Sequence, residues 1–302
     1  MNNLEHNGNV ISKKNGKDVI ICKKCGFAHV YPLPSLEETE NIYKNEYYQK
    51  EKPNYIKDYV KDKDWWVSTY NRRFDVFEKL VKSKNRSVLD IGSGPGIFLE
   101  AAKKRGWDAV GVEPNMYAAE YTKKLGFDVI NEMYDNKVAQ TLKKFDLINL
   151  TLVLEHIVNP IELIELAYNQ LNSNGIISIV VPNDFNPFQK ILSEYLGFEK
   201  WWVVPDHHLN YFNKESLSNC LLKNNFTVVH EETTFPIDLF LLFGDNYIDN
   251  HEIGSIVHQK RILFEKNLME SGNSDLLTSL YSALSKINIG RELFIIGKKL
   301  EN

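Results

Sequence analysis

VLDIGSGPGIFLE, residues 88–100, is the segment that most strongly predicts the fold class. It begins as a short apolar strand that ends at Asp90, turns through a glycine-rich loop and enters an amphipathic helix. Gly92, Gly94 and Gly96 let the backbone turn sharply and approach a ligand closely. The helix that follows presents free N–H groups and the positive end of its dipole. Such a unit is typical of α/β proteins that bind a ligand at the edge of a sheet.

Short apolar strands alternate with helices from this segment onward. This alternation predicts a doubly wound, mostly parallel α/β sheet. The expected strands are residues 87–92, 108–114, 127–130, 145–154, 175–182, 227–235 and 291–300. The expected helices between them are residues 97–106, 116–126, 157–171 and 215–226.

The chain divides into three parts by composition and pattern. Residues 1–35 contain two of the three cysteines, show little periodicity and end in the turn-rich YPLPS. Residues 36–82 are expected to form a helical cap in two or three pieces. Residues 83–302 form the α/β domain, with a mostly helical insertion at about 236–290. The aromatic side chains of the cap either pack internally or form a lid over a ligand: Tyr43, Tyr47, Tyr48, Tyr55, Tyr59, Trp65, Trp66 and Tyr70.

The composition excludes several classes of protein. The 302 residues are 43% hydrophobic and 25% charged, which is enough for a substantial core. A net charge of −4 disfavours a basic nucleic-acid binder. No apolar run is long enough to span a bilayer, and the first ten residues have no signal-peptide core. Because three cysteines cannot form a disulfide scaffold, we expect a cytoplasmic protein.

An acidic residue at the end of the next strand indicates a ligand that contains a ribose. Glu113 stands at the end of the strand over residues 108–114, where a carboxylate can accept hydrogen bonds from both ribose hydroxyls. A dinucleotide-binding protein would have the pattern GxGxxG, whereas this chain has GxGxG and Ile97 in place of the third glycine. An NAD(P)-dependent oxidoreductase is therefore the disfavoured alternative, and a glycine turn without any ligand is the other.

The pattern around Asp90 resembles motif I of the class I S-adenosylmethionine (SAM)-dependent methyltransferases. EPN at 113–115 resembles the ribose-binding turn of this family, and LEH at 154–156 resembles the segment after its fourth strand. LNSNGIISIVVPN at 171–183 resembles its fifth-strand region. The resemblance spans about 22–235 and implies a Rossmann-like sheet whose last strand is antiparallel.

The resemblance also implies which residues contact the cofactor. The glycines would meet the methionine part of SAM, and Asp90 would orient the loop and contact the amino group. Glu113 would hold the ribose, and Leu152 and Glu155 would flank the sulfonium. An alternative role for Glu155 and His156 is to hold their loop through backbone hydrogen bonds. The implied cofactor residues are Asp90, Gly92, Gly94, Gly96, Glu113, Pro114, Leu152 and Glu155.

The connection after the fifth strand contains the candidates for acid–base chemistry. Methyl transfer to a hydroxyl releases a proton, and a positioned base helps to accept it. PDHHLNYF at 205–212 offers His208, which we expect to be the general base, assisted by His207 or Tyr211. A structural or solvated histidine is the alternative for each imidazole.

The N-terminal cysteines suggest a metal. Cys22 and Cys25 form one CxxC, and His29 and His6 lie nearby in the sequence, so the four side chains can supply a tetrahedral zinc site. ICKKCG at 21–26 resembles the start of sugar and related small-molecule methyltransferases that carry a zinc-binding module. A reduced pair without metal is the alternative reading.

The insertion before the last strand offers cations for an acceptor. His258, Lys260, Arg261 and Arg291 are candidate contacts to a phosphate or carboxylate, although a charged helix face is the alternative. Arginine is rare here, with six residues among the 36 basic ones.

These observations together predict a SAM-dependent methyltransferase that acts on a small molecule. The resemblance implies a sugar, a nucleotide-linked sugar or another precursor of a surface glycan as the acceptor. The chain lacks the first cysteine pair and the large C-terminal domain of sugar C-methyltransferases, so we expect O-methylation. A zinc-containing nucleic-acid-binding module without turnover is a further alternative, and the acidic balance disfavours it.

Overall fold

The structure is a computed structural model that describes residues 6–41 and 55–300. The described residues form a seven-stranded sheet in the order β10-β11-β8-β7-β4-β5-β6. Strands β4 to β8 are parallel, and β11 runs antiparallel to both β8 and β10. This topology confirms the predicted fold class. The strands are β4 (Ser87–Ile91), β5 (Asp108–Val112), β6 (Asp128–Ile130), β7 (Phe145–Thr151), β8 (Leu171–Pro182), β10 (Phe226–Thr233) and β11 (Glu292–Lys299).

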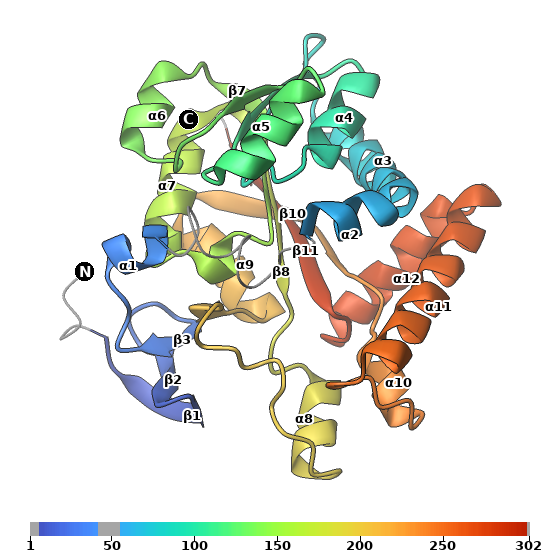
Figure 1. Ribbon diagram of the computed structural model, residues 1–302. Coiled ribbons are helices and arrows are strands. Elements are labelled where there is room, and N and C mark those ends of the chain that lie inside the picture. The colour runs from blue at the N-terminus through green and yellow to red at the C-terminus, as the bar shows by residue number, and fades with distance from the viewer. Residues whose placement is uncertain (1–5, 42–54, 301–302) are drawn as a thin grey trace.

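Helices cover both faces of this sheet, as Figure 1 shows. Val88 packs with α3 and α4 on one face, and the next residue, Leu89, packs with α7 and α9 on the other. Because successive side chains of a strand point to opposite faces, a strand buried on both sides is mostly apolar along its whole length. The helices are α3 (Lys63–Leu80), α4 (Ile97–Lys104), α5 (Met116–Lys124), α6 (Asn136–Thr141), α7 (Pro160–Gln170) and α9 (Lys214–Lys223).

The N-terminal part forms a second, four-stranded sheet with a strand from the α/β domain. Its strands are β1 (Gly8–Lys14), β2 (Lys17–Cys22), β3 (Ala28–Tyr31) and β9 (Asn210–Tyr211). The sequence analysis expected little regular structure in this segment. However, Asn15 and Gly16 both have positive φ, at 51° and 73°, and close a tight hairpin. Figure 1 shows the blue hairpin beside the yellow chain that carries β9.

The remaining helices frame one end of the main sheet. The cap is helical in pieces, as expected, and α11 packs against α3 while α12 packs against β10. None of the described helices is long and apolar enough to cross a membrane. The sequence analysis expected a loop where α8 lies. The remaining helices are α1 (Leu36–Asn41), α2 (Tyr55–Lys61), the 3₁₀ turn η3 (Leu154–His156), α8 (Pro187–Glu194), α10 (Asp238–Leu242), α11 (His251–Glu270) and α12 (Ser274–Lys286).

Candidate active site

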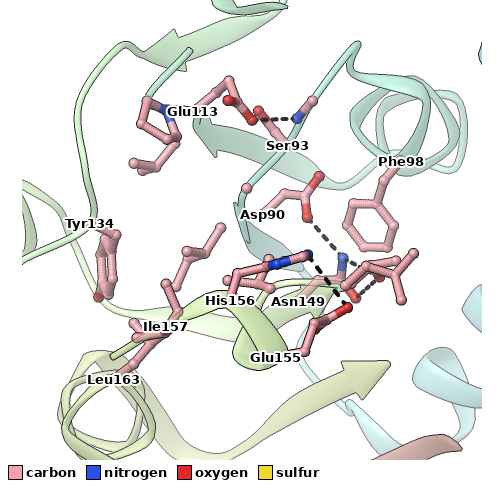
Figure 2. A pocket seen from close by; sticks show the side chains of 18 of the residues that line it. Asp90, Ser93, Phe98, Glu113, Tyr134, Asn149, Glu155, His156, Ile157 and Leu163 are labelled. Atoms are coloured by element: carbon pink, nitrogen blue, oxygen red, sulfur yellow. Dashed lines mark hydrogen bonds and ion pairs between the residues drawn. The ribbon is translucent and has the colours of Figure 1, made fainter. Parts of the chain in front are cut away.

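A cavity of about 1020 Å³ opens at the carboxyl ends of the parallel strands. Loops after β4, β5, β6 and β7 line one side of it, and Pro182 at the end of β8 lines the other. β4 lies between β5 and β7, so the chain order reverses at this point of the sheet. Open α/β sheets bind their ligands at such a position. Figure 2 shows the cavity with polar side chains from three neighbouring strand ends around it.

The glycine turn after β4 is held tightly by its neighbours. Gly92 N–H donates to the Val112 carbonyl at 2.8 Å, and Gly94 N–H donates to Glu113 Oε2 at 2.8 Å. Gly92 and Gly94 line the cavity. Gly96 does not; a Cβ there would come within 2.4 Å of Thr122 Cγ2, so this glycine permits close packing of α4 on α5. The structure therefore gives Gly96 a role in packing, whereas the sequence analysis expected cofactor contact.

Glu113 connects the glycine turn to the end of β5. It is 3% exposed and accepts a second hydrogen bond, from Asn115 N–H at 2.9 Å. Burial raises the pKa of Glu113 to about 7, although the two backbone N–H groups favour the charged form. Pro114 lies beside it in the cavity wall. The carboxylate thus keeps the loop closed and borders the space in which a ribose would lie.

Asp90 belongs to a buried polar network under the cavity. Its Oδ1 accepts a hydrogen bond from Asn149 Nδ2 at 2.8 Å, and Asn149 Oδ1 accepts one from Ser178 at 3.1 Å. Burial, with the nearby charge of Glu113, raises the pKa of Asp90 to about 7. Sequence analysis missed Asn149, although a polar residue inside the apolar strand over 145–151 was a visible signal.

The turn after β7 brings three proton-accepting side chains together. Leu152 adopts a positive φ of 56°, which sends the chain into the turn η3. His156 Nδ1–H donates to the His207 carbonyl at 2.8 Å, so its Nε2 faces Glu155 Oε1 at 3.8 Å. The imidazole of His208 lies 5.0 Å from that of His156, centroid to centroid. One nitrogen or oxygen atom of each of Glu155, His156 and His208 lies within 4.8 Å of the others.

The three candidates in the loop after β8 have different positions. His208 lines the cavity, whereas neither His207 nor Tyr211 does. Tyr211 is 2% exposed and packs in a cluster with Val19 and Val30, and burial raises the pKa of its hydroxyl. His207 holds His156 through its backbone carbonyl. Of the three, only His208 can therefore meet an acceptor directly in this arrangement.

Aromatic side chains of the cap form the opposite wall of the cavity. Tyr59 stacks on Trp66 at 4.8 Å, and Trp66 stacks on Tyr70 at 5.7 Å. These three and Trp65 line the cavity, and Tyr59, Trp66 and Tyr70 also pack in the core cluster around α3 and α4, so both expected roles remain open. Four charged or ionisable residues from later in the chain complete this wall: His258, Arg261, Arg291 and Glu292. The remaining aromatic residues, Tyr43, Tyr47, Tyr48 and the side chain of Tyr55, lie outside the described part.

The N-terminal sheet brings His6, Cys22, Cys25 and His29 together. Their ligand atoms lie within 4.8 Å of one another, with His6 Nδ1 at 3.1 Å from His29 Nε2. The sulfurs of Cys22 and Cys25 lie 3.6 and 3.5 Å from His6 Nδ1. Zinc bonds of roughly 2.0–2.3 Å in a tetrahedron separate neighbouring ligand atoms by roughly 3.3–3.8 Å. The two sulfur–nitrogen distances lie in this range, and the nitrogen–nitrogen distance of 3.1 Å is slightly shorter. His29 Nδ1–H donates to the Val30 carbonyl at 2.7 Å, which leaves Nε2 for a metal.

The sheet topology, with Asp90 near the end of β4 and Glu113 directly after β5, is that of a class I, Rossmann-like SAM-dependent methyltransferase. Residues 66–231, more than half of the chain, match the family described as a methyltransferase domain. The chain belongs to this family, and SAM is its cofactor. The family match excludes the NAD(P)-dependent oxidoreductase that the sequence analysis kept as an alternative.

Curated relatives match parts of the chain. A ubiquinone biosynthesis O-methyltransferase of Actinobacillus pleuropneumoniae serotype 7 (strain AP76) is 29% identical over 102 residues, which cover 30% of this chain and 44% of that protein. The protein of the same name from Pelagibacter ubique (strain HTCC1062) is 30% identical over 158 residues, which cover 48% and 63%. The match thus spans less than two thirds of either relative.

Solved structures share the fold at low identity. The plantazolicin methyltransferase BamL, in complex with a triazolic desmethylPZN analog and SAH, has a TM-score of 0.53 at 17% identity. The superposition covers 87% of this chain and 97% of BamL. A SAM-dependent methyltransferase from Archaeoglobus fulgidus has a TM-score of 0.50 at 20% identity, covering 80% and 99%. These similarities confirm the fold.

Proposed function

We propose that this methyltransferase acts on a hydroxyl oxygen of a small molecule: a sugar, a nucleotide-linked sugar or another precursor of a surface glycan. The observation that carries methyl transfer to a hydroxyl is the arrangement within one cavity. Asp90 and Glu113 border one end, and Glu155, His156 and His208 meet on the acceptor side. Two relatives named O-methyltransferases support oxygen as the methylated atom. The sugar part rests on the sequence resemblance alone.

The proposed roles follow from the positions of the side chains. SAM supplies a methyl group on a sulfonium, which is transferred in line to the acceptor oxygen. Asp90 and Glu113 hold the amino group and the ribose, while Leu152 flanks the sulfonium. His208 accepts the hydroxyl proton as the new O–C bond forms and the S–C bond breaks. Glu155 lies close enough to the two imidazoles to stabilise the resulting positive charge.

A methyl-transfer screen tests the proposed acceptor class. Purified protein is incubated with isotopically labelled SAM and, in separate reactions, free sugars, nucleotide sugars and small phenols. We expect labelled product from a sugar or nucleotide sugar, with the methyl group on oxygen by NMR. Label that enters only a phenol would overturn the sugar assignment. Label found on carbon or nitrogen would overturn O-methylation.

We also propose that His6, Cys22, Cys25 and His29 hold one structural zinc ion. The distances given above support it, and all four tetrahedral positions are filled by protein, which leaves none for a substrate. Elemental analysis of protein made without a polyhistidine tag should find about one zinc per chain. Cys22→Ser should lose the metal, whereas Cys220→Ala, a core cysteine of α9 outside the cluster, should keep it. Metal content near zero in the unaltered protein would remove the zinc proposal alone.

These assignments give each segment of the chain a proposed role. We propose residues 1–35 as the metal-binding segment, 36–82 as the cap and 83–302 as the methyltransferase domain, with the insertion near 236–290 completing the acceptor wall. The three free cysteines support the cytoplasmic location predicted from the sequence, which stays a prediction.

A further inference from the structure

The acceptor end of the cavity contains two arginines from distant parts of the chain. Arg261 lies in the middle of α11, and Arg291 directly precedes β11. Both line the cavity, and so does His258, one turn before Arg261. Lys260, the fourth candidate from the sequence, does not line it and forms an ion pair with Asp245 at 3.5 Å. Three of the four predicted cations therefore line the cavity, and the fourth does not.

Arg291 stands on the acceptor side of the sheet. The next residue, Glu292, pairs with Pro182 at the carboxyl end of β8, two strands away from β4. Arg291 Nη1 is buried, yet no hydrogen-bond acceptor reaches it within the described part of the chain. A buried guanidinium N–H without an acceptor is unfavourable, because the group has lost its hydrogen bonds to water. An oxygen of a bound ligand would remove that penalty.

Neighbouring side chains fix the position of the Arg261 guanidinium, but they do not use all of its hydrogen-bond donors. It is 8% exposed, and its guanidinium lies over the ring of Trp65 at 4.9 Å. Its Nε lies 3.6 Å from Glu265 Oε1, which is longer than a hydrogen bond. Glu265 already accepts hydrogen bonds from Trp65 and Tyr281. The stacked, oriented guanidinium thus keeps donors for a partner in the cavity.

Asp62, Asp184 and Asp238 near these arginines are engaged elsewhere or partly neutral, whereas Glu292 lines the cavity beside Arg291. Asp62 binds His258 at 2.8 Å, and Asp238 accepts a hydrogen bond from Tyr247 at 3.0 Å. Burial raises the pKa of Asp184 to about 7, although the positive charge of Arg291 favours its ionised form, and no ion pair joins the two within the described residues. The negative charge of Glu292 acts to raise the pKa of Arg261 and that of Arg73, a buried arginine behind the wall. Within the described residues, none of these acids hydrogen-bonds to Arg261 or Arg291.

The distribution of arginine along this chain supports a functional role for this wall of the cavity. Lysine outnumbers arginine 30 to six, and four of the six arginines belong to this wall or the space behind it. Of these four, Arg72 is paired with Glu232 at 2.6 Å. A planar guanidinium binds carboxylates and phosphates with two parallel hydrogen bonds, which an ammonium group cannot do.

We propose that Arg261 and Arg291 bind an anionic group, a carboxylate or a phosphate, on the methyl acceptor. This inference rests on the proposed function, because it identifies this end of the cavity as the acceptor site. It narrows the acceptor to molecules that carry an anion, such as a sugar phosphate, a nucleotide sugar or a uronic acid.

Binding of inorganic phosphate to the protein saturated with S-adenosylhomocysteine (SAH) tests the proposal. Line broadening of the phosphate ³¹P signal measures the affinity, and calorimetry on the same samples measures SAH binding. We expect saturable phosphate binding that weakens by about tenfold or more in Arg291→Gln, with recovery in part in Arg291→Lys. Lys260→Gln should bind phosphate like the unaltered protein, since Lys260 faces solvent. Competition by acetate or benzoate shows whether a carboxylate enters the same site.

Three results would overturn the anion site: no saturable phosphate or carboxylate binding, equal affinity in Arg291→Gln, or an equal loss in Lys260→Gln. Normal SAH binding in those samples would leave the methyltransferase assignment intact. Absence of SAH binding by the unaltered protein would instead remove the cofactor basis of the proposed function. SAH affinity in Arg291→Gln also reports whether that variant folds.

Discussion

The two ends of the cavity are built in different ways. At the end proposed to bind SAM, Asp90, the glycine turn and Glu113 come from one short stretch of chain; Glu113 holds the turn through Gly94 N–H, and Asn149 of β7 holds Asp90. At the acceptor end, His208, Arg261 and Arg291 come from separate segments, and within the described residues Arg261 Nε and Arg291 Nη1 have no hydrogen-bond acceptor. The first end is preformed for one constant ligand. The second is assembled by the tertiary fold and can vary with the acceptor, because loops and insertions change more easily than a strand–turn–helix unit.

The largest expected effect is a loss of the rate of methyl transfer that leaves the affinity for the cofactor product unchanged. His208→Ala should lower the single-turnover rate about 10²–10⁴-fold, the usual contribution of a general base, while SAH affinity stays within about twofold. His251→Ala, at an exposed position in α11, is the matched control. Rapid-quench kinetics with labelled SAM measure the rate once an acceptor is known. A normal rate in His208→Ala would move the role to Glu155 or His156, or leave catalysis to proximity alone.

A smaller loss of turnover is expected when the contact between the N-terminal sheet and the acceptor end is removed. Asn210 pairs with His29 of the metal cluster across β3 and β9, and its side chain donates to the Leu154 and Ile157 carbonyls at 2.8 and 2.6 Å. Asn210→Ala removes two buried hydrogen bonds that hold the turn η3, so turnover should fall by about tenfold or more. SAH affinity and zinc content should remain. A parallel loss of SAH affinity would show instead that the variant disturbs the whole domain.

A further prediction concerns pH at the SAM end. The pKa values of Glu113 and Asp90 are raised to about 7, and a ribose hydroxyl donates to the charged carboxylate. SAH affinity should therefore fall by about tenfold per pH unit below 7 for each of the two carboxylates, about a hundredfold for both together, and level off above pH 7. Calorimetry from pH 5.5 to 8.5 measures this, with Glu113→Gln expected to show a flatter profile. A pH-independent affinity in the unaltered protein would contradict the role of an ionised Glu113.

The same raised pKa values have the opposite effect on the stability of the ligand-free protein, which should decrease as pH rises. The folded, ligand-free protein binds these two protons more tightly than the unfolded chain does. Their contribution to the free energy of unfolding is therefore fully present below the ordinary carboxyl range and is lost as pH rises to about 7. SAH should offset this loss, because it binds the folded state alone.

The sequence predicted the strand, the glycine turn and the acid at the end of the next strand, because their signals are local. The strand, the glycine turn and the acid at the next strand end occupy about 25 residues, and each has a pattern that short-range physics explains. Two local signals were nevertheless missed. Asn15-Gly16 marks the hairpin of the N-terminal sheet, and Asn186 with Gln189 forms the capping box that starts α8.

The acceptor end could be predicted only as candidate residue types. Nothing near Arg291 in the sequence shows that it faces the cavity while Lys260 faces solvent. That outcome depends on how α11 packs against α3 and how β11 pairs with β8. For the same reason Tyr211, adjacent to promising residues in the sequence, is carried into the N-terminal sheet.

Calorimetry with SAH tests the central claim, that the two ends work separately, most directly. The unaltered protein should bind one SAH per chain, and Glu113→Ala should weaken binding by about tenfold or more, because it removes the acceptor for the ribose hydroxyls. Glu120→Ala, an exposed acid in α5, should bind normally, as should His208→Ala and Arg291→Gln. Equal losses in Glu113→Ala and in the two acceptor-end variants, or normal binding in Glu113→Ala, would contradict the account.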